Sequence, residues 1–126
     1  MVTNAMNWFE IPVEDFERAK IFYSKILDFD MPTMNMDQIT KGILLYDQPG
    51  GGAGGAITTG PGTKPASDTG IRIYLNSGKN LETILNRVES AGGKIIQHKF
   101  KINDEIGHIA VFQDTEGNQI GLHSHE

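Results

Sequence analysis

The chain of 126 residues contains no cysteine. This absence excludes disulfide bonds, thiolate zinc sites and a cysteine nucleophile, and it is typical of proteins that work in a reducing compartment. Long apolar runs are missing too, because no uninterrupted apolar stretch approaches the twenty residues of a membrane-spanning helix. The first residues, Met1 to Asn4, lack the basic and then apolar order of a signal peptide. We therefore expect a cytoplasmic protein without a membrane partner.

Positive charge is scarce. The chain has 11 Lys and Arg against 16 Asp and Glu, a formal net charge of -5, and no basic run that would follow a phosphate backbone. We therefore expect no nucleic-acid partner. Hydrophobic residues make up 38% and charged residues 21%, which predicts a folded globular chain, and the length predicts a single domain over residues 1–126.

What the sequence does contain is a strand and helix pattern near its start. Residues 6–11 alternate as in a strand, with Met6, Trp8 and Glu10 on one face, and Pro12 ends it. Residues 14–27 then carry apolar side chains at steps of three and four, which predicts an amphipathic helix. The members of that stripe are Phe16, Ala19, Phe22, Tyr23, Ile26 and Leu27.

The same pattern returns about half a chain later. Residues 71–75 predict a strand and residues 80–91 a helix, which Gly92 and Gly93 close. A shift of 65 residues places Phe16 on Leu81 and Tyr23 on Val88. The sequence therefore predicts two similar modules, one over about 5–60 and one over about 70–124, joined by a connector over about 60–69 that is rich in glycine and proline.

After each predicted helix come three short apolar runs separated by turn residues. They cover residues 29–36, 39–46 and 53–59 in the first module, and residues 94–100, 108–113 and 118–124 in the second. Each module is then βαβββ, and the fold class is α+β. A small sheet with a helix on one face leaves its other face exposed. The exposed faces of the two modules must therefore pack against each other or against those of a second chain. We expect a cleft between them.

Two motifs carry a family resemblance that spans essentially the whole chain. They are the Arg-Ala-x-x-Phe-Tyr element at residues 18–23 and the Asp-Thr-Glu-Gly-Asn turn at residues 114–118. Together with the paired modules, they resemble the vicinal oxygen chelate superfamily, which includes glyoxalase I, bleomycin and fosfomycin resistance proteins and extradiol dioxygenases. The resemblance implies a half-barrel cleft and a homodimer, and it leaves the function open because this fold serves several chemistries.

The metal-using members of this superfamily take their ligands from the first and last strands of each module. The matching positions here are Trp8, a position near Ala56, Ile71 or Ile73, and Gly121. A divalent metal needs imidazole or carboxylate groups that converge on one point, and none of these side chains supplies one. We therefore expect no metal site and no cofactor, although a divalent metal held by other residues stays an alternative.

Other residues are candidates for a ligand site. Glu10 is expected to face the cleft beside Trp8, where it would serve as a general base or as an anchor for a cationic or hydroxylated ligand. The alternative is a solvated carboxylate, or one paired with a Lys or Arg on another strand. Trp8 offers a flat surface on which a ligand can stack.

The histidines of the last hairpin are a second set of candidates. We expect alternation to place His108 and His123 on the inner face, with Gly121 on the same side as His123, for proton transfer or hydrogen bonding to a ligand. Histidines at the surface or at a sheet edge are the alternative. The candidate catalytic residues are then Glu10 and His108, and the candidate ligand-binding residues are Trp8, Glu10, His108, Gly121 and His123.

From these residues and the resemblance we expect a protein that binds a small, partly apolar molecule in the cleft without a metal. A metal-dependent lyase or isomerase of the glyoxalase type is the first alternative. A structural or interaction module without a ligand is the second. Whether the chain is an enzyme stays open at this point.

Overall fold

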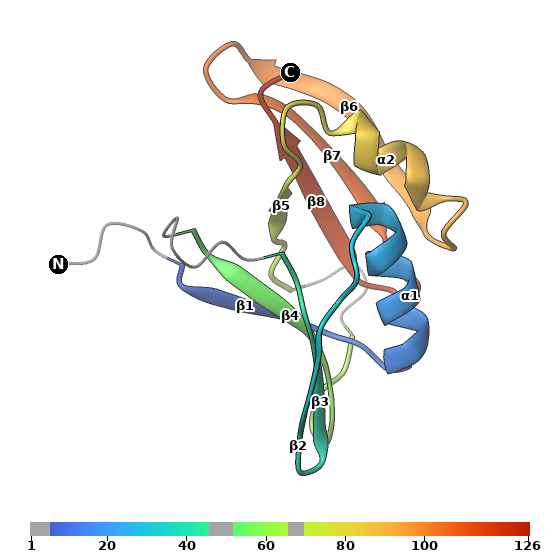
Figure 1. Cartoon of the computed structure of the whole chain (residues 1–126). Coiled ribbons are helices and arrows are strands. Elements are labelled where there is room, and N and C mark those ends of the chain that lie inside the picture. Colours follow the sequence, from blue (N-terminus) through green and yellow to red (C-terminus); the bar gives the residue numbers. More distant parts are fainter. Residues whose placement is uncertain (1–5, 46–51, 66–69) are drawn as a thin grey trace, which may run out of the picture.

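A computed structural model describes residues 6–45, 52–65 and 70–126. Within them the chain forms two four-stranded mixed sheets and two helices, so the predicted α+β fold with two tandem βαβββ modules is confirmed (Figure 1). The end of the strand predicted over residues 39–46 and the connector residues 66–69 lie outside the described part. Neither helix of the described residues has the length and apolar character needed to cross a membrane.

The first sheet belongs to the first module. Its elements are β1 (Trp8–Pro12), α1 (Phe16–Leu27), β2 (Thr33–Met36), β3 (Ile39–Ile43) and β4 (Gly54–Thr59). The strand order is β1-β4-β3-β2, and β4 pairs parallel with β1 and antiparallel with β3. As a result β4, the last strand of the module, lies in the middle of the sheet beside the first strand.

The second sheet repeats this topology. Its elements are β5 (Tyr74–Asn76), α2 (Glu82–Val88), β6 (Lys94–Asn103), β7 (Gly107–Gln113) and β8 (Gln119–Ser124). The order is β5-β8-β7-β6, with β5 and β8 parallel. The observed β5 begins three residues later than predicted, and Ile71, the first predicted strand residue, is 96% exposed.

Helix α1 follows the predicted apolar stripe closely. Asp15 caps its start by accepting a hydrogen bond from the Arg18 N–H, and Asp28 ends it in a left-handed conformation. Its buried face packs on the sheets together with the buried face of α2, and Figure 1 shows the two helices side by side. One core therefore runs through both modules on the helix side of the sheets, built from Ile11, Phe22, Ile57, Leu85, Phe112 and Leu122 among others.

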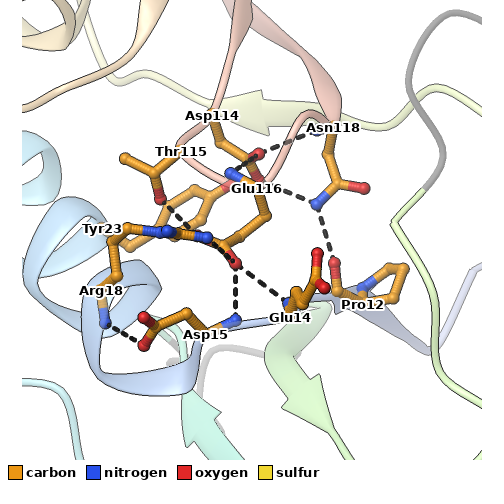
Figure 2. A network of polar contacts seen from close by, with 9 residues as sticks. All are labelled: Pro12, Glu14, Asp15, Arg18, Tyr23, Asp114, Thr115, Glu116 and Asn118. Carbon is orange, nitrogen blue, oxygen red and sulfur yellow. Dashed lines mark hydrogen bonds and ion pairs between the residues drawn. The ribbon is translucent and has the colours of Figure 1, made fainter.

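The turn between β7 and β8 fastens the second module to the start of α1 (Figure 2). The fully buried Glu116 carboxylate accepts hydrogen bonds from the backbone N–H groups of Glu14 and Asp15, at 3.0 and 2.7 Å. It also accepts two from the Arg18 guanidinium, at 2.7 and 3.0 Å. A carboxylate at this place satisfies N–H groups at the start of the helix and lies at the positive end of its dipole.

Asp114 and Asn118 complete this contact. Asp114 accepts a 2.7 Å hydrogen bond from the Tyr23 hydroxyl of α1, and Asn118 donates one of 2.8 Å to the Pro12 carbonyl at the end of β1. Burial raises the pKa of Tyr23 well above its usual value, and the negative charge of Asp114 adds to that rise. Both family motifs therefore meet at one contact between the modules, which fixes the relative position of the two sheets.

Candidate ligand-binding site

A hollow of about 750 Å³ lies where the two modules meet. The first module contributes one residue of β1, residues that precede β1 and β4 or follow β3, and the last residue of α1, and the second module contributes β5. The lining is mostly apolar and consists of Met6, Phe9, Leu27, Leu44, Leu45, Gly52, Ala53, Tyr74, Leu75 and Asn76. Its polar side chains are the Tyr74 phenol and the Asn76 amide. A mainly apolar hollow with few polar groups is the usual form of a small-molecule site.

Trp8 and Glu10 flank Phe9 in β1 and do not line the hollow, because they lie on the sheet face that points away from α1. The neighbouring residues Phe9 and Ile11 pack against the core on the opposite face. Trp8 is 40% exposed, and its indole N–H donates to the Glu10 carboxylate at 3.4 Å. The predicted placement of Trp8 beside Glu10 is therefore what the structure shows.

Glu10 also forms an ion pair with Lys41 of β3. Strands β1 and β3 are not neighbours, because β4 lies between them, so the two side chains meet across β4. The register places Glu10 opposite Ala56 and Lys41 opposite Thr58. Both β4 residues are buried under this bridge. Of the alternatives for Glu10, the structure shows the carboxylate paired with a lysine on another strand.

On the second module, Tyr74 occupies the corresponding face. It lies opposite Gly121, and its ring rests where a side chain at that position would be, because a Cβ on Gly121 would come within 2.2 Å of the ring. The assignment of the second module's metal-ligand position to Ile71 or Ile73 is wrong. Ile73 packs against the core, and the alternation then turns Tyr74 to the cleft face.

The expectation that His108 and His123 share the inner face is wrong. In the antiparallel pair, His108 lies opposite Ser124 while His123 lies opposite Ile109, so the two histidines are on opposite faces of the sheet. The His108 ring lies 3.2 Å from the His125 carbonyl oxygen, and His123 Nε2 donates to the Ile106 carbonyl at 2.6 Å. His123 shares its face with Tyr74 and Gly121, whereas His108 lies on the helix side, away from the cleft.

The positions from which this fold would draw metal ligands do not fit a metal. With the observed register they carry Trp8, Ala56, Tyr74 and Gly121, which together offer one phenol oxygen. No group of three or more His, Cys, Asp or Glu side chains comes together anywhere in residues 6–45, 52–65 and 70–126. Glu10, the nearest carboxylate, is already paired with Lys41.

Residues 5–122 match the model of the Glyoxalase/Bleomycin resistance protein/Dioxygenase superfamily. The chain belongs to this superfamily. Since the match covers nearly the whole chain, both modules belong to it. No curated protein matches.

Several solved structures share the fold. Fosfomycin resistance protein FosX from Listeria monocytogenes superposes with a TM-score of 0.65 at 15% identity, over 98% of this chain and 92% of that one. A glyoxalase/bleomycin resistance protein from Albidiferax ferrireducens gives 0.66 and 15%, over 96% and 98%. Glyoxalase I from Zea mays gives 0.66 and 18%, over 94% of this chain and 44% of the maize chain. At these identities the likeness establishes the fold alone.

Sequence reasoning missed Lys41 and Thr58. A signal for Lys41 was present, because Ile39, Lys41 and Ile43 alternate on one face of a predicted strand, where a lone charge between apolar residues needs a partner. Thr58 gave no such signal. Only the register of β4 against β1 and β3 places it under the Glu10–Lys41 pair.

Proposed function

We propose that this superfamily member binds a small, partly apolar molecule in the hollow between its modules, without a metal ion. The observation that carries the proposal is the hollow itself, since both modules line it and most of its lining is apolar. Tyr74 and Asn76 supply the hydrogen bonds that orient the molecule. Gly121 and His123 share the sheet face of Tyr74 and Asn76, and we assign Trp8 and Glu10, on the face of the first sheet that points away from α1, to the same site.

Other hollows of the described residues support a ligand less well. One lies on the outer surface of α1 and is lined by charged side chains such as Lys20 and Lys25, and another lies beside α2 around Lys79 and Arg87. Neither is lined by a strand residue of either sheet. An apolar molecule gains most by leaving water at the module junction.

Binding is tested by titrating a library of small aromatic and aliphatic compounds and following the fluorescence of Trp8, the only tryptophan of the chain. Leu45→Glu places a charge in the lining of the hollow and is expected to weaken binding of any hit at least tenfold. Ile71→Glu makes the same change at a site outside the hollow and is the matched control. Equal affinity of the two variants, or no hit in a broad library, contradicts the proposal.

Independence from metal is tested by elemental analysis of untagged protein purified without chelators. We expect no stoichiometric nickel, zinc, manganese or iron, and unchanged ligand binding after dialysis against a chelator. One equivalent of metal per chain would instead favour a metal-dependent lyase or isomerase of the glyoxalase type.

We also propose that the chain forms a homodimer. Met34, Met36 and Ile39 are exposed on the same sheet face as Lys41, which leaves apolar surface uncovered in a single chain. Sedimentation velocity is expected to give the mass of two chains, and Met34→Asp is expected to shift it towards one. A single-chain mass for the unaltered protein contradicts the proposal.

A further inference from the structure

We propose that the ligand carries a neutral hydroxyl group, which binds over β4 between Thr58, Lys41 and Glu10. This inference rests on the proposed function and specifies the chemical class of its ligand. Thr58 is 4% exposed, and its Oγ1 is the buried side-chain atom that lacks a hydrogen-bond partner within the described residues.

A buried hydroxyl without a hydrogen-bond partner, such as that of Thr58, is unusual in a folded protein. Burying it without a partner destabilises the fold, and valine would fill the same space without that cost. Native structures keep few such groups, and a bound molecule is one way to satisfy them. Thr58 therefore indicates a ligand group that exchanges a hydrogen bond with its hydroxyl.

The residues around Thr58 determine which chemical group of a ligand can bind there. Thr58 lies directly opposite Lys41, whose ammonium pairs with Glu10 across β4. Lys41 only donates hydrogen bonds, the Glu10 carboxylate only accepts them, and a threonine hydroxyl does both. A hydroxyl on the ligand matches this set, because its oxygen accepts from Lys41 or Thr58 while its hydrogen is donated to Glu10.

Charge argues for a neutral group rather than an ion. Lys41 and Glu10 neutralise each other, and the Lys41 side chain is only 18% exposed. A carboxylate placed here would approach Glu10, and an ammonium would approach Lys41, so each would meet one like charge in a partly desolvated place. A neutral hydroxyl meets neither penalty.

The start of β1 connects the hollow to this polar site. Met6 lines the hollow, Trp8 follows two residues later, and Glu10 two residues after that. Four residues of extended chain span at most about 14 Å. An apolar body in the hollow, stacked on Trp8, would bring a terminal hydroxyl to the ion pair. Because the stem of Lys41 has four flexible carbons, it can uncover Thr58 without a change in the backbone.

The test uses the full chain and four probes on one apolar frame: biphenyl, 4-hydroxybiphenyl, biphenyl-4-carboxylate and biphenyl-4-methylammonium. Affinities are measured by equilibrium dialysis at neutral pH. We expect 4-hydroxybiphenyl to bind about tenfold more tightly than biphenyl, and more tightly than either ion. In Thr58→Val this advantage is expected to fall below about twofold while the affinity for biphenyl is unchanged.

Thr59→Val is the matched control, because Thr59 is the next residue of β4 and alternation turns it to the other face. It should keep the tenfold advantage. Thermal unfolding of Thr58→Val should show a protein at least as stable as the unaltered chain, since the substitution removes an unsatisfied group. A loss of stability would show that the hydroxyl has a partner in the folded chain and would overturn the inference.

The outcomes separate this inference from the function on which it rests. If biphenyl binds but the hydroxyl gives no advantage, if Thr58→Val keeps the advantage, or if an ion binds best, the inference is overturned and the apolar site stands. If none of the four probes binds, the proposed function fails and the inference falls with it.

Discussion

Arg18 and Glu116 lie 98 positions apart in the chain, and Arg18 Nε donates to Glu116 Oε2 at 2.7 Å. The Glu116 side chain is fully buried, while that of Arg18 is half exposed. The pair joins the second module to the first turn of α1, where Glu116 also accepts two backbone hydrogen bonds.

Replacing Glu116 by glutamine is expected to lower the free energy of unfolding by about 2 kcal/mol, because hydrogen bonds to a charged group become neutral ones. Urea denaturation followed by circular dichroism measures this change. Glu105→Gln, in the exposed turn between β6 and β7, is the control and should change stability by less than about 0.5 kcal/mol. Equal effects of the two substitutions would contradict the assigned role of Glu116.

The same carboxylate makes stability depend on pH in acid. Burial alone would raise the pKa of Glu116, but hydrogen bonds from Arg18, the Asp15 N–H and Thr115 outweigh it and hold the pKa at about 2, below the ordinary 4.5. A lowered pKa in the folded state stabilises the fold above the unfolded value, and the gain is lost as pH falls through the folded value. The stability advantage over Glu116→Gln should therefore shrink between pH 4.5 and 2.

Asp114 titrates in the opposite sense, because burial raises its pKa. It is present in both proteins, so its contribution cancels in the difference between them. A difference that stays constant down to pH 2 would contradict the lowered pKa of Glu116.

Tyr23→Phe removes the hydroxyl that donates to Asp114 at 2.7 Å. Because the buried Asp114 carboxyl loses one of its hydrogen-bond partners, we expect a loss of about 1–3 kcal/mol in chemical denaturation. Tyr74→Phe removes a hydroxyl from a ring that is 46% exposed and is the control, with an expected change below about 0.5 kcal/mol. A Tyr23→Phe protein as stable as its control would show that the hydrogen bond contributes nothing.

Gly121→Ala is expected to push the Tyr74 ring away from β8, because the new Cβ would come within 2.2 Å of it. Overpacking of this kind costs about 1–3 kcal/mol, and the displaced ring should also weaken ligand binding. In a Tyr74→Ala background the same substitution should cost little, since the obstacle is gone. A double-mutant cycle measures the coupling, and additive effects would contradict the contact.

Periodicity predicted the module order and both helices, because apolar spacing reports which face of a helix is buried. It predicted α1 over residues 14–27, and the helix covers Phe16 to Leu27, because the apolar stripe there is clear. It placed β5 too early, because Ile71 to Leu75 look like a strand although only Tyr74 to Asn76 pair with β8. Apolar content alone does not reveal where pairing begins.

The site was harder to predict because it depends on register. A shift of one residue turns every side chain of a strand to the other face, which is why Tyr74 rather than Ile73 reaches the cleft and why His108 does not. Lys41 and Glu10 meet across a third strand, a relation that no spacing along the chain encodes. The turn at residues 114–118 was predicted as a hairpin, but its bonds to α1 depend on tertiary contact.

The start of α1 is bound by a turn more than ninety positions downstream. The two modules are similar in sequence, but we do not expect either to fold independently. A chain severed in the connector would leave a leading fragment whose helix has lost its anchor and a trailing fragment with a carboxylate that has lost its counter-ion. Each module therefore depends on the other for its stability. The hollow between them forms only when both modules are folded and in contact.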